Sequence, residues 1–334
     1  MENKIISKKI CFLTSGLLLL ILLTASLIVL LIPSNQVYAA TNDALIVEDM
    51  SDDCAITKKY TNIQGFLNSK KSRSRSMSEG SQVDLLLDTL NINKDDLDCI
   101  NESALLSARS ITVSDTLMIT DEDGNLSTLA TEYKTEKDFP DIPGDNGKAG
   151  YMAGRIVVIQ SPEYDKYNNQ NKFLAYGFEC SFSMRWLKDP LYTMKDYFTF
   201  CADNGAYTED DVECTLTADV RSESPSIGIE RYTYSTKATV AYKSSGWPVC
   251  YFNLYNDVYT ANSSIDYSNY RISARARIFS QNNFLIRMCY AHKQLVGGDL
   301  KPTISISSSG PSISFSGTSH REYQSPNFNV GFVV

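Results

Sequence analysis

The sequence predicts a mainly β protein, with an antiparallel β-sandwich or jelly-roll-like domain over residues 150–334 that follows a small α-helical segment and an export signal. The main observation is the stretch FLAYGFECSFSMRWL, in which every even position from 174 to 186 is apolar and most positions between them are polar or small. Successive side chains of a strand point to opposite faces, so this pattern predicts one long strand with one buried face. The same period recurs over residues 232–242 and 272–278.

Two further observations favour this fold class. Of the 20 tyrosines, 17 lie beyond residue 150, as do both tryptophans, and wide side chains suit a pleated surface. Turn signals separate the alternating runs and no long helical pattern interrupts them, which is typical of sandwiches and jelly rolls.

The stretch TISISSSGPSISFSG, residues 303–317, predicts a β-hairpin with its turn at Ser309 and Gly310. That turn would place Ile304 opposite Phe315 and Ile306 opposite Ile313. Each arm has about six residues, whereas a membrane-crossing strand needs about 9 to 11. We therefore expect a hairpin that covers a core, with a pore-forming hairpin as the alternative.

Residues 1–39 have the layout of an export signal. Lys4, Lys8 and Lys9 precede 23 uncharged residues, and Val37 and Ala39 supply the small residues of a cleavage site. The alternative is a retained membrane anchor, because the uncharged run is long enough to span a bilayer. Both interpretations place the rest of the chain outside the cytoplasm, secreted or at the cell surface.

Residues 40–110 are expected to be an acidic, partly disordered segment with short helices. Apolar residues at 83, 86, 87 and 90 recur at helical spacing. Before them, SKKSRSRSMSEGS predicts a flexible linker or, alternatively, a protease processing site. Residues 111–149 are expected to hold a hairpin around Asp123 and Gly124 and a second linker, FPDIPGDNGKAG, which marks a domain boundary near residue 149.

The charge balance bears on the class of partner. The whole chain has a net charge of −8, and without residues 1–39 it has 28 basic and 38 acidic side chains. This excess of acid argues against nucleic acid as a partner.

Seven cysteines follow the export signal, and an extracellular compartment makes disulfides the expected state. Pairing along the chain suggests three bridges: Cys54–Cys99, Cys201–Cys214 and Cys250–Cys289. This leaves Cys180 as a buried thiol or as the site of an intermolecular bridge. No pair has the C-x-x-C spacing of a zinc or redox site, and the sequence does not determine the connectivity.

The acidic loop between Cys201 and Cys214 is a candidate metal site. We expect Asp203, Asp210 and Asp211 to be the ligands, and calcium is the cation that such clustered carboxylate oxygens would bind. The alternative is a solvated acidic loop, and no other cofactor is predicted.

Signatures of catalysis are mostly absent. His292 and His320 are the only histidines, and the sequence contains no G-x-S-x-G, H-E-x-x-H or phosphate-binding loop motif. We therefore predict no catalytic residue, although His320 with a serine and an acid brought together by the fold would indicate a hydrolase.

Aromatic and basic side chains of the second half are candidates for ligand binding. Exposed aromatic rings suit sugar stacking, and a basic strip suits an anionic glycan or lipid headgroup. The candidates are Trp247, Tyr251, Tyr255, Arg271, Arg275 and Arg277. The alternatives are core packing for the aromatic residues and an ordinary solvated sheet face for the arginines.

We therefore expect an exported extracellular or cell-surface protein whose β-sandwich module binds a glycan or a surface protein, with membrane contact only through a retained N-terminal segment. One alternative is a secreted toxin or bacteriocin-like proprotein with a removable N-terminal segment. The other is a secreted hydrolase with an unrecognised site.

Overall fold

The computed structural model describes residues 44–51, 55–73, 77–92, 101–120, 126–128, 151–186, 195–208, 212–242, 247–255, 257–291, 301–307, 310–316 and 332–333. Residues Asn42–Val334 form one of two compact units. The expected export signal, Cys54, Cys99, Asp210, Asp211 and both histidines lie outside the described residues.

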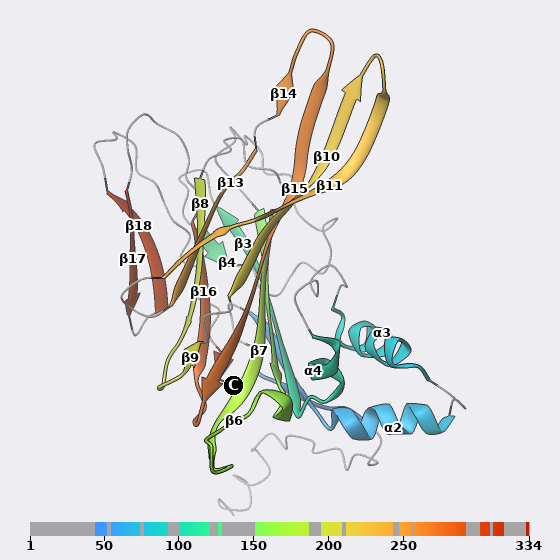
Figure 1. Cartoon of the computed structure of the whole chain (residues 1–334), viewed down its shortest axis with the longest axis vertical. Helices are drawn as coiled ribbons and strands as arrows, with labels where there is room; N and C mark the ends of the chain where they lie inside the picture. Colours follow the sequence, from blue (N-terminus) through green and yellow to red (C-terminus); the bar gives the residue numbers. More distant parts are fainter. Residues whose placement is uncertain are drawn as a thin grey trace, which may run out of the picture. The chain divides into compact units, whose positions relative to one another are not determined.

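The protein is mainly β, and the described strand pairs are antiparallel (Figure 1). The largest sheet has the strand order β1-β2-β3-β5-β7-β15-β10-β11, and the short strands β4, β6, β9 and β14 pair with its members. Its strands are β1 (Ile46–Asp49), β2 (Ile56–Thr61), β3 (Ser110–Thr120), β4 (Leu126–Thr128), β5 (Tyr151–Gln160), β6 (Lys166–Tyr167), β7 (Phe173–Trp186), β9 (Tyr207–Thr208), β10 (Glu213–Ser224), β11 (Gly228–Lys237), β14 (Val258–Tyr259) and β15 (Ser264–Ser280).

The second sheet has the order β12-β13-β8-β16-β19, and a separate hairpin joins β17 to β18. These strands are β8 (Lys195–Ala202), β12 (Thr239–Tyr242), β13 (Pro248–Asn253), β16 (Leu285–Ala291), β17 (Lys301–Ser307), β18 (Gly310–Ser316) and β19 (Phe332–Val333). In the hairpin, Ile304 pairs with Ile313 and Ser307 with Gly310. The hairpin is therefore present, but its register differs by two residues from the predicted one.

The main hydrophobic core contains residues of both larger sheets. The alternation predicted for β7 places Cys180, Phe182 and Met184 in this core, where each is fully buried. Phe182 stacks on Phe200 of β8, with ring centroids 4.3 Å apart. Burial of each such aromatic side chain contributes about 1.5–3 kcal/mol to folding.

A second core lies between the large sheet and three helices, α2 (Ile63–Arg73), α3 (Glu79–Leu90) and α4 (Glu102–Leu106). The apolar spacing noted in the sequence lies in α3, whose Val83, Leu86, Leu87 and Leu90 are buried. These side chains pack in one cluster with residues of β2, β3 and β5. Ser78 caps the start of α3, and Asn91 ends it in the left-handed conformation.

The structure corrects the first part of the expected linker SKKSRSRSMSEGS, residues 69–73. This stretch is helical through Arg73, because α2 buries Ile63, Phe66 and Leu67 in the second core. Ser69 Oγ donates to the carbonyl of Phe66 at 2.8 Å, so the serine is accommodated within the helix.

The large sheet also runs across the expected boundary near residue 149. Strands β3 and β5 pair directly, from Ser110 with Gln160 to Ile119 with Tyr151. Among the described residues, no helix has the length and apolar character needed to cross a membrane.

In the structure the five described cysteines are buried and are not bonded to one another, while Cys54 and Cys99 lie outside the described residues. In the strand register, Cys250 of β13 pairs with Phe198 of β8, whereas Cys289 of β16 pairs with Thr199, the next residue of β8. Neighbouring positions of a strand face opposite sides, so β8 separates the two sulfur atoms. Accordingly, Cys250 belongs to the main core and Cys289 to a cluster on the other face.

Cys201 and Cys214, another expected pair, are likewise not bonded to each other in the structure. Cys201 lies in β8 and Cys214 in β10, which belong to different sheets. Burial raises the pKa of the Cys201 thiol to about 11, so this side chain is protonated at neutral pH.

Candidate binding surface

The aromatic residues chosen from the sequence lie in or beside the cores. Trp247 is buried against Phe200, with ring centroids 6.3 Å apart. Tyr251 is half-buried against Tyr197. Tyr255 is half-buried, and its hydroxyl shares a hydrogen bond of 3.0 Å with that of Tyr234. The structure therefore uses these rings in packing and does not bring them together as one exposed surface.

The three arginines lie on β15, on the face of the large sheet opposite the main core. Arg271 is opposite Arg185 in the register, and Arg275 bridges Glu179 and Glu213. The Arg277 guanidinium lies over the Tyr164 ring, 4.6 Å from its centroid. Arg275 therefore contacts β7 and β10, and Arg277 contacts η3 (Pro162–Tyr164).

Asp203, the one described member of the predicted calcium site, has a structural role. Its Oδ1 accepts a hydrogen bond of 2.6 Å from the backbone N–H of Leu285, and its own N–H donates to the Leu285 carbonyl. These bonds join the end of β8 to the start of β16. Within the described part of the chain, no group of three or more metal-ligating side chains could hold an ion.

A different set of aromatic side chains is exposed, around the hairpin that joins β6 to β7. The rings of Tyr167, Phe173 and Tyr176 are 53, 37 and 39% exposed. Their centroids form a continuous series, 5.8 Å from Tyr167 to Phe173 and 4.6 Å from Phe173 to Tyr176. We call these three rings and the loop at residues 168–172 the aromatic surface.

The loop of the aromatic surface is rich in amides. Asn168 Oδ1 accepts hydrogen bonds of 2.9 Å from the backbone N–H groups of Gln170 and Lys172, which closes the turn. Asn171 has a φ of +55°, in the left-handed region that asparagine tolerates better than most residues. Since Asn168 fixes the backbone, the exposed side chains of residues 169–172 are available to solvent or a ligand.

The hairpin is fastened to the sheet through η3 (Pro162–Tyr164), the short 3-10 helix before β6. Gly177 of β7 lies so close to η3 that a Cβ there would be 2.2 Å from the Tyr164 carbonyl oxygen. The Gly177 carbonyl accepts from Ser161 N–H at 3.3 Å, and its own N–H donates to Asp165 Oδ1 at 3.3 Å. Glycine is therefore required at this position for close packing.

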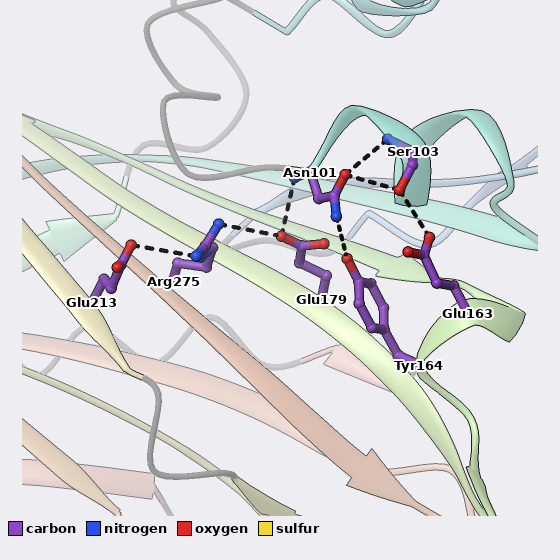
Figure 2. A network of polar contacts seen from close by, with 7 residues as sticks. All are labelled: Asn101, Ser103, Glu163, Tyr164, Glu179, Glu213 and Arg275. Atoms are coloured by element: carbon purple, nitrogen blue, oxygen red, sulfur yellow. Dashed lines mark hydrogen bonds and ion pairs between the residues drawn. The ribbon is translucent and has the colours of Figure 1, made fainter.

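A polar network connects η3 to the helical layer (Figure 2). Asn101, the N-cap of α4, donates through Nδ2 to the Tyr164 hydroxyl at 3.0 Å and through its backbone N–H to Glu179 Oε1 at 3.1 Å. Ser103 Oγ donates to Glu163 Oε2 at 2.9 Å. The hairpin is thus held by residues that are about 60 positions away in the sequence.

Glu179 and Arg275 extend this network across the sheet. Glu179 is 2% exposed, and its Oε1 is 4.0 Å from Arg275 Nη1. Arg275 Nη2 is 3.4 Å from Glu213 Oε2, which is much more exposed. Burial of Tyr164, together with the Glu179 carboxylate beside it, raises the pKa of the tyrosine to about 12. The Tyr164 hydroxyl therefore remains a neutral group throughout the physiological pH range.

Sequence reasoning missed the aromatic surface because it assigned Leu174 and Tyr176 to the buried face of β7. Both are exposed, since this end of the strand does not pack in the main core. The stretch YNNQNKFLAY, residues 167–176, did contain a signal: aromatic residues that flank an amide-rich turn.

Comparison of the chain with protein-family models gives no match, and comparison with curated proteins gives no similar sequence.

Proposed function

We propose that this protein is an exported carbohydrate-binding protein, a β-sandwich that holds its ligand on the aromatic surface. The supporting observation is the exposed series Tyr167, Phe173 and Tyr176 beside an amide-rich loop. Burial of one such ring would contribute about 1.5–3 kcal/mol, so three adjacent exposed rings leave apolar area available for binding.

The chemistry of this surface suits a sugar. The C–H face of a pyranose packs on an aromatic ring, while amide side chains both donate and accept hydrogen bonds and so match hydroxyl groups. Asn169, Gln170 and Asn171 supply such amides between Tyr167 and Phe173. Export, which the first 39 residues predict, would bring the surface to extracellular polysaccharides.

We do not propose that the N-terminal segment is removed as a pro-region, because its removal would take β3 out of the large sheet. Strand β3 lies between β2 and β5, and its separation from β5 would break a ladder from Ser110 to Ile119. The hydrolase alternative rests on His320, which lies outside the described residues.

The proposal is tested by binding of the full-length protein to a panel of oligosaccharides, followed by titration calorimetry with the ligands it retains. We expect Tyr167→Ala and Phe173→Ala each to weaken binding about three- to tenfold, as removal of one aromatic contact does. Tyr259→Ala is the matched control, because Tyr259 is 69% exposed but lies on β14. Equal loss in all three variants, or capture of proteins and no oligosaccharide, would contradict the proposal.

A further inference from the structure

Three basic side chains border the aromatic surface. The Arg109 guanidinium lies over the Tyr176 ring, 5.6 Å from its centroid, and is partly exposed. Lys172 is exposed in the amide-rich loop. Lys166 precedes Tyr167, and its Nζ lies 4.5 Å from the Phe279 ring centroid. Cationic groups therefore lie at the Tyr176 end of the ring series and in the loop between Tyr167 and Phe173, although the net charge of the chain is −8.

The two acidic side chains next to the aromatic surface, Asp165 and Glu163, both have partners elsewhere in the chain. Asp165 has a side chain only 1% exposed, and its Oδ2 is 2.8 Å from Arg109 Nη2. Glu163 accepts its hydrogen bond from Ser103 in α4. The Asp165 carboxylate is thus buried and paired, the exposed Glu163 carboxylate accepts from Ser103, and the Arg109 guanidinium and Lys172 lie at the rings.

Arg109 is suited to a planar anion. A guanidinium that stacks on an aromatic ring keeps its N–H donors at its edge, where they match the two oxygens of a carboxylate. The ion pair with the buried Asp165 carboxylate holds the guanidinium in place over Tyr176.

From this charge arrangement we infer that the carbohydrate bound by the aromatic surface carries carboxylate groups, as polymers of uronic acids do. The inference rests on the proposed function and specifies its ligand class. The rings would contact the apolar faces of the sugar units, the amides their hydroxyls, and Arg109 and Lys172 their carboxylates.

The experiment compares matched oligosaccharides by titration calorimetry with the full-length protein: tetragalacturonate against the neutral galactose tetramer, with dextran sulfate as a second anion. We expect tetragalacturonate to bind at least tenfold more tightly than the neutral tetramer. This preference should decline as salt is raised from about 0.05 to 0.5 M, because salt screens exposed charges.

Variants separate local charge from the net charge of the protein. Lys172→Gln should weaken tetragalacturonate binding about two- to fivefold, as expected for one exposed ion pair. Lys237→Gln, which removes an exposed charge from β11, is the control and should have no effect. Equal binding of the charged and neutral tetramers, or preference for dextran sulfate, would overturn this inference and leave carbohydrate binding intact. Binding to no saccharide would overturn the proposed function as well.

Discussion

Replacement of Gly177 by alanine tests how the aromatic surface is held in place. A Cβ at this position would lie 2.2 Å from the carbonyl oxygen and 2.4 Å from the carbonyl carbon of Tyr164. These are backbone atoms, so no side-chain rotation can relieve the overlap. Non-bonded carbon atoms are ordinarily about 3.5–4.0 Å apart, so η3 would have to move away from β7 by about 1 Å.

The expected cost follows from the contacts that this movement breaks. The hydrogen bonds from Ser161 N–H to the Gly177 carbonyl and from Gly177 N–H to Asp165 are already 3.3 Å long, so a further 1 Å would remove both. Overpacking costs about 1–3 kcal/mol, and each lost hydrogen bond costs about 1 kcal/mol. Since the movement that breaks the bonds also relieves part of the overlap, we expect Gly177→Ala to lower the free energy of unfolding by about 2–4 kcal/mol.

The measurement is urea unfolding of Gly177→Ala beside Gly80→Ala. Gly80 lies in the first turn of α3, and a Cβ there meets no atom within 4 Å. Alanine is also the better helix former, so this control should be unchanged or slightly more stable than the wild type. If the two variants unfolded within about 0.5 kcal/mol of each other, the close packing of η3 on β7 would be refuted.

Three further predictions concern the network and the cysteines. Asn101→Ala should lower the free energy of unfolding by about 1–2 kcal/mol more than Ser78→Ala, because both remove an N-cap but only Asn101 also bonds Tyr164; equal losses in urea would contradict this. The pKa of Tyr164 is about 12 in the folded state and about 10 in the unfolded chain, so the unfolded state loses this proton first and stability falls as pH rises from 10 to 12. Tyr164→Phe should make this fall less steep in pH-dependent unfolding, and an unchanged slope would argue against the assignment. The described cysteines should resist alkylation in the native protein and react once it is unfolded without reductant, whereas mass loss from disulfides would contradict their thiol state.

The sequence predicted the mainly β class because burial imposes a period of two on a strand. This signal is strong where a strand packs on the core, as at Phe182 and Met184, which are fully buried. It fails at Tyr176, which keeps the alternation but lies beyond the core and is exposed. Periodicity indicates which residues share a face, but not how far along the strand that face is covered.

Pairing between distant segments was harder to predict. The disulfide between Cys250 and Cys289 was expected from their order along the chain. In the structure, a one-residue difference in register along β8 directs the two side chains to opposite faces. Likewise, the linker composition near residue 149 gave no indication that β3 and β5, on either side of it, are neighbours in one sheet.

The aromatic surface combines local and distant determinants, and this division explains what sequence reasoning could find. The rings and the amides lie within residues 167–176, so the local sequence contains the groups that would meet a ligand. Their fixed position also depends on Asn101, which is 63 residues before Tyr164 and bonds it because the helical layer packs on the sheet. Binding to this hairpin costs less free energy than binding to a mobile hairpin, because the hairpin is already ordered before the ligand binds. The affinity of the surface should therefore depend on residues that make no contact with the ligand, and a variant such as Asn101→Ala should weaken binding even though Tyr167, Phe173 and Tyr176 are intact.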